Sequence, residues 1–199
     1  YLVGLDRNST RIKSTTGNTL TLSNSTENVN GVYDITIEST SASTDDSAVL
    51  ITGNNQELKD VIINAPNGAR SVYVNGAYTQ NIQHAAVFGG EIRVDVGVVN
   101  LHSVTSTGSL NATGGTTRLI DCTFANTSSD AVVQDGGTVY FVSGKLVSGS
   151  AKKDYKQNAR TLYLGWVDYT SAKMQLSGTK SLLFKSTDLF YDHTVSGLN

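Results

Sequence analysis

Short runs in which apolar and polar residues alternate recur along the chain, and most of them end at a glycine. Alternation with a period of two is typical of a β-strand with one buried face, and glycine permits the sharp turn that follows. The glycines recur about every 20 residues or at twice that distance, so the pattern predicts a solenoid of stacked coils. The runs are AVLITG, SVYVNG, EIRVDVG, SLNATG, AVVQDG and KMQLSG, which end at Gly53, Gly76, Gly97, Gly114, Gly136 and Gly178.

A second apolar strand follows each glycine, as in VIINAP, NIQHAAV and RLIDCTF. Each unit is therefore predicted to be strand, turn, strand and loop, with coils of roughly 17 to 26 residues. Helical repeats would need an apolar period of 3.6, which is absent. A β-sandwich or barrel stays open as an alternative, because Asn30-Gly31, Asn67-Gly68 and Asn75-Gly76 are also typical of hairpin turns.

Side chains two and four positions before each glycine are predicted to lie inside the solenoid, where coils must bury one set of side chains against each other. In the unit that ends at Gly97, the apolar positions shift by one residue. The predicted interior residues are Val49, Ile51, Val72, Val74, Ile92, Val94, Val96, Leu110, Ala112, Met174 and Leu176.

The alternate positions point outward and should stack from coil to coil into polar columns. One predicted column is Leu50, Tyr73, Arg93, Asn111 and Gln175, and the next is Thr52, Asn75, Asp95, Thr113 and Ser177. On the second strand the outward candidates are Glu38, Asn64, Gln83, His102 and Asp121.

Part of this outward surface has the chemistry that a sugar chain requires, since an aromatic ring packs on the apolar face of a sugar and polar groups bond its hydroxyls. The alternative is a solvated polar face that keeps a parallel sheet soluble and binds nothing. The predicted glycan-binding residues are Tyr73, Asn75, Glu91, Arg93, Asp95 and Asn111.

The phrases YDITIESTSASTDDSAVLITGNNQELKDVIINA and TTRLIDCTFANTSSDAVVQDGG resemble coils of the right-handed parallel β-helix, the pectin-lyase-like fold of pectic enzymes and phage tailspikes. The resemblance covers Leu20 to Gly149 and Lys173 to Asp192 and lies in the rhythm of the sequence. It implies an all-β solenoid that serves as a structural and host-attachment segment of a phage tailspike or tail fibre. It also implies a homotrimer that contacts other virion tail proteins and binds a surface polysaccharide. The implied location is a virion or a cell surface. A polysaccharide depolymerase of the same fold and a bacterial surface adhesin are the alternatives.

We expect residues 1–199 to form one β-helix domain, as a segment of a longer chain. The opening YLVGL already resembles a strand, so we expect preceding structure to cover it. Between residues 150 and 172 the rhythm breaks in SAKKDYKQNAR, which predicts an insertion or an irregular coil.

The catalytic residues of the resembling enzymes do not carry over to this chain. Cleavage of a glycosidic bond needs a proton donor opposite a base or nucleophile. The adjacent pair Asp45-Asp46 lacks the Asn-x-Asp and Gly-His-Gly phrases of a polygalacturonase, and Gln134-Asp135-Gly136 only faintly matches a pectinesterase. We therefore expect binding rather than catalysis. If a catalytic site exists, its candidate acids are Asp45, Asp46, Asp121, Asp130 and Asp135, although Asp45 and Asp130 also suit turns.

Composition narrows the function classes further. Charged residues make up 16% of the chain and the formal net charge is −2, which argues against a nucleic-acid partner. No apolar run approaches the roughly 20 residues of a membrane span. His84 and His102 lack a third ligand, so we predict no metal site, and we predict no cofactor. Cys122, the single cysteine, is expected to be a buried, inert thiol.

Overall fold

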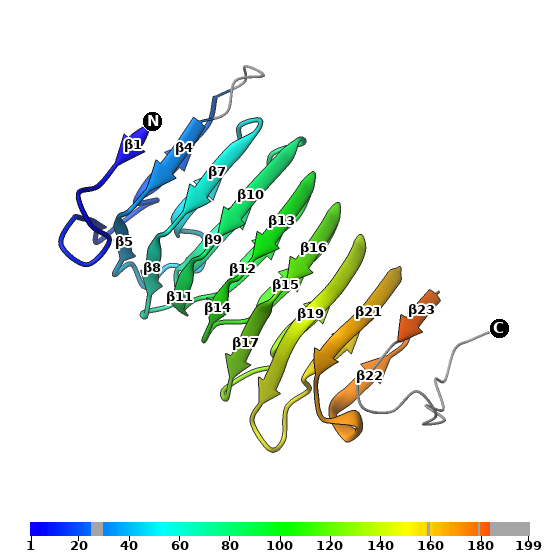
Figure 1. Cartoon of the computed structure of the whole chain (residues 1–199). Helices are drawn as coiled ribbons and strands as arrows, with labels where there is room; N and C mark the ends of the chain where they lie inside the picture. The colour runs from blue at the N-terminus through cyan, green and yellow to red at the C-terminus, as the bar shows by residue number, and fades with distance from the viewer. Residues whose placement is uncertain (25–29, 159, 179, 184–199) are drawn as a thin grey trace.

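The protein is a parallel β-solenoid of about seven turns in a computed structural model that describes residues 1–24, 30–158, 160–178 and 180–183 (Figure 1). Every strand pair in the described residues is parallel, and strands of successive coils lie beside each other in register. Apart from one 3-10 helical turn, η1 (Ser171–Lys173), the regular structure is all strand. The predicted all-β solenoid is confirmed.

Three sheets run along the solenoid. Sheet I contains β1 (Leu2–Val3), β4 (Asn30–Tyr33), β7 (Gln56–Lys59), β10 (Thr79–Gln83), β13 (Val98–His102), β16 (Thr116–Ile120), β23 (Lys180–Leu183) and the first halves of β19 (Thr138–Ser148) and β21 (Thr161–Asp168). Sheet II contains β2 (Arg11–Ser14), β5 (Thr36–Ser39), β8 (Ile62–Ala65), β11 (Ala86–Gly89), β14 (Thr105–Ser106), β17 (Cys122–Asn126) and the second halves of β19 and β21.

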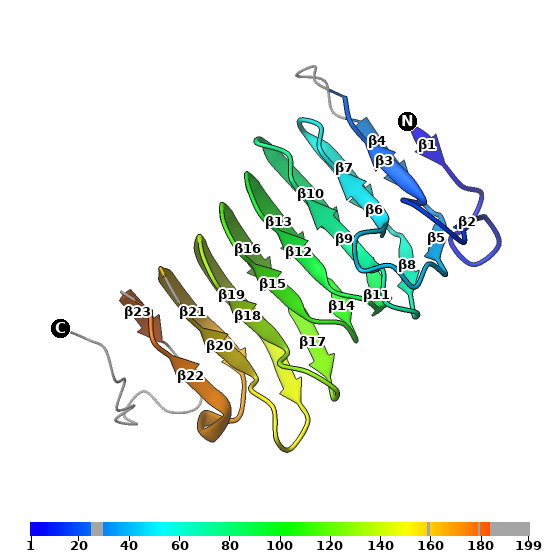
Figure 2. The same ribbon diagram turned by 180° about the vertical axis from the view of Figure 1, so that it is seen from behind.

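Sheet III lies behind the other two and faces the viewer in Figure 2. It contains β3 (Leu20–Leu22), β6 (Ser47–Ile51), β9 (Arg70–Val74), β12 (Ile92–Val94), β15 (Leu110–Ala112), β18 (Val132–Gln134), β20 (Tyr155–Gln157) and β22 (Met174–Leu176). The predicted unit of strand, turn, strand and loop is corrected, because a full coil has three strands: segments predicted as one second strand, such as NIQHAAV and RLIDCTF, divide between sheets I and II. The segment QELK, which lies between the predicted strands AVLITG and VIINAP, is β7 of sheet I.

The bend from sheet I to sheet II occurs at one residue per coil in the left-handed backbone conformation. The residues at this position, with φ from 50° to 55°, are Asp34, Asp60, His84, Ser103 and Asp121. Asp and Asn tolerate left-handed geometry better than most side chains, which accounts for the acidic residues here. Asp121 therefore has a structural reason for its place in the sequence.

The interior is filled by stacked aliphatic columns from all three sheets. The predicted interior residues of β6, β9, β12 and β15 are at most 1% exposed. Val96 is the exception, since its side chain is 38% exposed. β12 ends at Val94, and Val96 lies in the turn before Gly97, so the expected shift of register does not extend to it. Met174 and Leu176 of β22 are partly buried and pack against the core.

Residues 150–172 contribute β20 to sheet III and β21 to sheets I and II, and both strands pair with the preceding coil. The turn at residues 149–154 joins β19 to β20. Gly165 lies within β21 at the bend from sheet I to sheet II, whereas Gly178 follows a strand of sheet III, which explains their short spacing. The predicted β-helix stretch from Lys173 to Asp192 lies outside the described residues from residue 184 onward. No helix of the described part is long and apolar enough to cross a membrane.

Candidate functional site

The predicted outward columns on sheet III are in register. Tyr73 of β9 pairs with Arg93 of β12, which pairs with Asn111 of β15. The column continues through Val133 and Lys156 before it reaches Gln175. The side chains stack because successive coils are hydrogen-bonded in register. Residues at the same distance before each turn therefore lie in one line along the solenoid.

Asp95 is the centre of a polar cluster that joins three successive coils. Its Oδ2 accepts a hydrogen bond from the Tyr73 hydroxyl at 2.7 Å, and its Oδ1 lies 2.8 Å from Nε of Arg93. The hydroxyl of Thr113, one coil further along, donates to the same Oδ1. The side chains of Arg93 and Asp95 are 31% and 21% exposed, so the cluster lies at the surface.

The electrostatics of the cluster favour an ionised Asp95 and a neutral Tyr73. Burial acts to raise the pKa of Asp95, but the hydrogen bonds from Arg93, Thr113 and Tyr73 outweigh it and lower that pKa below its ordinary value. The hydrogen bond to Asp95, together with burial, raises the pKa of Tyr73. The same carboxylate raises the pKa of Arg93. The charge pair is thus fixed at neutral pH.

A second pair extends the cluster toward the turn between sheets II and III. Nε of Arg70 lies 3.4 Å from Oε1 of Glu91, and its guanidinium lies over the Tyr73 ring, 4.7 Å from the centroid. Nδ2 of Asn111 is 3.5 Å from Oε2 of Glu91. Arg70 was missed in the sequence because it occupies the first position of β9, outside the alternation used to assign columns.

The structure brings together five of the six residues predicted to bind glycan, namely Tyr73, Glu91, Arg93, Asp95 and Asn111. Asn75 lies in the same column as Asp95 and is exposed, and its backbone N–H donates to the Ile51 carbonyl. The outward candidates of the second strand divide between two sheets. Glu38 and Asn64 lie on sheet II, whereas Gln83 and His102 lie on sheet I.

The five candidate acids are distributed over all three edges of the solenoid. Asp45, Asp46 and Asp130 lie between sheets II and III, Asp121 lies between I and II, and Asp135 lies between III and I. Asp130 is four coils from the Asp45-Asp46 pair, which corresponds to roughly 19 Å. Carboxylates that cleave a glycosidic bond are about 5 to 9.5 Å apart.

The individual environments of these acids are mainly structural. Asp46 accepts a hydrogen bond from the Gly17 backbone N–H at 2.8 Å, and Asp130 accepts one from the Lys153 N–H at 2.8 Å. Asp135 accepts from the Asn158 amide at 2.6 Å. Asp45 is 94% exposed and lies 3.9 Å from Arg70. These contacts tie turns of one coil to the next.

The two histidines lie near each other on the edge between sheets I and II. Their ring centroids are 5.8 Å apart. His84 lies 3.5 Å from Asp60, and His102 lies 3.9 Å from Asp121. No group of three or more potential metal ligands occurs among the described residues.

An aromatic surface on sheet I was missed in the sequence. Tyr140 of β19 and Tyr163 of β21 stack with centroids 4.6 Å apart, and Trp166 follows on β21 with a side chain that is 57% exposed. The signal was present in TVYF and TLYLGW, two alternating runs with an aromatic residue at an outward position. It was overlooked because the column assignment was made from the glycines of sheet III.

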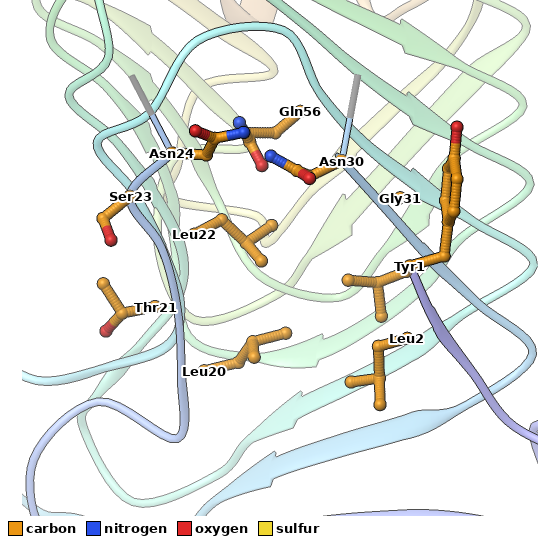
Figure 3. Close-up of a pocket in the computed structure, with 11 residues that line it drawn as sticks. Tyr1, Leu2, Leu20, Thr21, Leu22, Ser23, Asn24, Asn30, Gly31 and Gln56 are labelled. Atoms are coloured by element: carbon orange, nitrogen blue, oxygen red, sulfur yellow. The ribbon is translucent and has the colours of Figure 1, made fainter. Parts of the chain in front are cut away.

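Figure 3 shows a hollow of about 290 Å³ at the first coil of the solenoid. Leu20 and Leu22 of β3 line one side of it, Leu2 of β1 lies on the opposite side, and the buried Gln56 of β7 lies near Asn24 and Asn30. These leucines continue the interior columns of the following coils, since Leu20 pairs with Val49 and Leu22 with Ile51. The hollow is the end of the core.

Comparison of the chain with protein-family models, with curated proteins and with solved structures gave no match.

Proposed function

We propose that this chain is a structural and host-attachment segment of a phage tailspike or tail fibre that binds a surface glycan along sheet III. The observation that carries the proposal is the cluster around Asp95. Asp95 holds Arg93 through Nε, and among the described residues no partner accepts from the two terminal amino groups of that arginine. An arginine fixed in this way presents a preorganised pair of donors to a ligand.

The neighbouring groups supply further polar contacts. Asn111 and Glu91 lie beside Arg93 on the outward face, and the exposed Asn75 follows the strand before it. The Tyr73 ring lies beneath two guanidinium groups, at 4.7 Å from that of Arg70 and 5.8 Å from that of Arg93. Recognition on this face therefore depends on hydrogen bonds to sugar hydroxyls rather than on stacking against Tyr73.

The solenoid itself supports a role in attachment. Coils that contact only their neighbours build an extended surface, on which one binding group per coil is repeated along a line. The virion location, the homotrimer and the contacts with other tail proteins come from the resemblance in sequence rhythm. Sedimentation of the purified full-length protein tests the trimer, which a monomeric species would contradict.

The test of function is retention of the protein on immobilised bacterial surface polysaccharides, with new reducing ends followed in the same samples. We expect retention without cleavage by the wild-type protein, and at least a tenfold weaker interaction for Arg93→Gln, which corresponds to about 1.4 kcal/mol. Lys156→Gln is the matched control, because it removes one positive charge from the same column three coils away.

Each result decides between the candidate functions. Equal losses for both variants would show non-specific attraction by charge and would contradict the proposal. Release of reducing ends would favour the alternative, a polysaccharide depolymerase of the same fold. Retention by a protein that fractionates with a bacterial envelope and not with virions would favour a surface adhesin.

A further inference from the structure

A row of outward side chains on sheet I changes from polar to aromatic along the solenoid. Register places these residues on one line of successive coils. Asn100 donates from Nδ2 to Oδ1 of Asn81 at 2.9 Å, and Nη1 of Arg118 lies 3.4 Å from Oδ1 of Asn100. The row is Asn81, Asn100, Arg118, Tyr140 and Tyr163.

The two tyrosines form a rigid stack. The angle between the two ring planes is 2°. The guanidinium of Arg118 lies over the Tyr140 ring, 5.8 Å from its centroid. Stacked rings cover each other's faces, so the ring edges and the hydroxyl groups are the parts that remain available to a ligand.

Beside the stack lies an apolar groove of about 180 Å³. Tyr140 and Tyr163 line one side of it and Trp166 the other, with Val142 and Gly165 between them. Val142 is 46% exposed and Trp166 is 57% exposed, which is unusual for an apolar side chain and an indole on adjacent strands. Gly165 has no side chain to fill the space between Tyr163 and Trp166.

Arg118 differs from the arginines of sheet III in having no carboxylate partner. Arg93 and Arg70 pair with Asp95 and Glu91, whereas no acidic group of the described residues lies within ion-pair distance of Arg118. Two carboxylates close to Trp166 in register or in sequence already have partners. Oδ1 of Asp121 accepts from the Ser143 hydroxyl at 2.6 Å, and Asp168 lies 3.8 Å from Lys145.

We propose that this surface, composed of Arg118, Tyr140, Tyr163 and Trp166, is a second saccharide site and that it binds an anionic glycan. The apolar face of one sugar ring packs on Trp166, its hydroxyls bond the tyrosine hydroxyls, and an acidic substituent pairs with Arg118. Arg118 and Tyr163 are two coils apart, roughly 10 Å, so the site spans at least two sugar units.

A glycan suits the surface better than a protein partner does. Polar groups adjoin the apolar strip, because Arg118 precedes Tyr140 in the row and Ser143, which pairs with Trp166, donates to Asp121. A stable protein interface needs about 800 Å² on each partner with an apolar centre. This inference rests on the proposed function only in that the chain binds a glycan. The second site lies on sheet I instead of sheet III, and its ligand is anionic.

The experiment uses Trp166, the single tryptophan of the chain, as a reporter at the site. The protein is titrated with acidic bacterial polysaccharides, polymers of uronic acids and of sialic acid, and with the same polymers after reduction of their carboxyl groups. We expect a saturable change in tryptophan fluorescence with an acidic polymer, at an affinity at least about tenfold above that for its reduced form.

Three variants test the role of the charge and identify the sheet that binds. Arg118→Gln should abolish the preference for the acidic form, and Arg118→Lys should keep it, which separates loss of charge from a change in the packing of Tyr140. Arg93→Gln on sheet III should leave the fluorescence titration unchanged.

The outcomes separate this inference from the proposed function. Retention on polysaccharides with no fluorescence change would overturn the second site and leave the sheet III proposal standing. No retention and no fluorescence change would overturn both. Equal responses to acidic and reduced polymers would overturn the anionic ligand. A fluorescence change that follows protein concentration without glycan would show that a second copy covers the groove, and would overturn the site.

Discussion

The hydroxyl of Tyr73 donates a 2.7 Å hydrogen bond to Asp95, which belongs to the next coil of the solenoid. Asp95 accepts from Arg93 of its own coil and from Thr113 of the coil after it. A single carboxylate therefore connects three coils on the outer face of sheet III. The outer face contributes to cohesion along the solenoid as well as to the surface offered to a ligand.

Replacement of this carboxylate should weaken the fold. We expect Asp95→Asn to lower the free energy of unfolding by about 2 kcal/mol at neutral pH, since hydrogen bonds to a charged group each contribute more than neutral ones. Urea denaturation of wild type and variant measures the difference. A loss below about 0.5 kcal/mol would mean that the three contacts are replaced by water at no cost.

The effect of Asp95 should depend on pH in a defined direction. Its pKa is lower in the folded state than in the unfolded chain, so its contribution is present above the ordinary carboxyl pKa of roughly 4 and is lost as the pH falls through the lower folded value. The gap in stability between wild type and Asp95→Asn should therefore narrow in acid. A gap that widens as the pH falls would contradict this assignment.

A stacked glycine imposes a second constraint. Gly97 has φ of +82°, and a Cβ at this position would lie 2.2 Å from the Gly76 carbonyl oxygen. Gly97→Ala should cost more than the roughly 1 to 3 kcal/mol of a strained backbone alone. Gly17→Ala is the control, because Gly17 has φ of +68° with nothing within 4 Å. Thermal unfolding of both variants measures the difference, and similar losses would show that the coils move apart freely.

The core contains a hydrogen bond that is eliminated when a single oxygen atom is deleted. The hydroxyl of the fully buried Tyr155 donates to Oε1 of Gln134 at 2.9 Å. Tyr155→Phe should cost about 1 to 2 kcal/mol, since a buried acceptor loses its donor. Tyr78→Phe, at a residue that is 55% exposed, should change stability by less than about 0.5 kcal/mol. Equal effects in urea denaturation would show that water replaces the buried donor.

Cys122 should be unreactive in the folded protein. Burial raises the pKa of its thiol to about 11, and Sγ donates to the Leu101 carbonyl at 3.3 Å. Since the thiolate is the reactive form, alkylation by iodoacetamide at neutral pH should occur only after unfolding. Mass spectrometry of native and denatured samples gives the two extents. Rapid labelling of the native protein would mean that β17 opens readily.

The sequence predicted the columns of sheet III because most of its strands alternate and are followed by a turn glycine. The alternation correctly separated the two faces of these strands. The interior residues include Val72, Val74, Leu110 and Ala112, and the outward residues include Tyr73 and Arg93. Val96 was wrongly predicted to be interior. It lies two residues after the buried Val94 and so continues the apolar alternation, although β12 ends at Val94. Hydrophobic alternation does not mark the last residue of a strand.

The strands of sheet I could not be distinguished from turns, or from the strands of sheet II, by the same pattern. β7 is QELK, and only Leu58 among its residues is apolar. Its pairing with β4 and β10 depends on neighbouring coils, which no local window contains. The same dependence hid the stack of Tyr140 on Tyr163, because two residues more than 20 positions apart in sequence become neighbours only through register.

Since all strand pairs are parallel and lie across the long axis, the backbone hydrogen bonds between coils point along that axis. A force that pulls the two chain ends apart therefore loads the bonds of the outermost coil first. The bonds open a few at a time rather than in one sheared set, and each coil that peels away lengthens the chain and relaxes the tension. Under load such a molecule would extend in steps, one coil per step, while the remaining coils keep their surfaces intact.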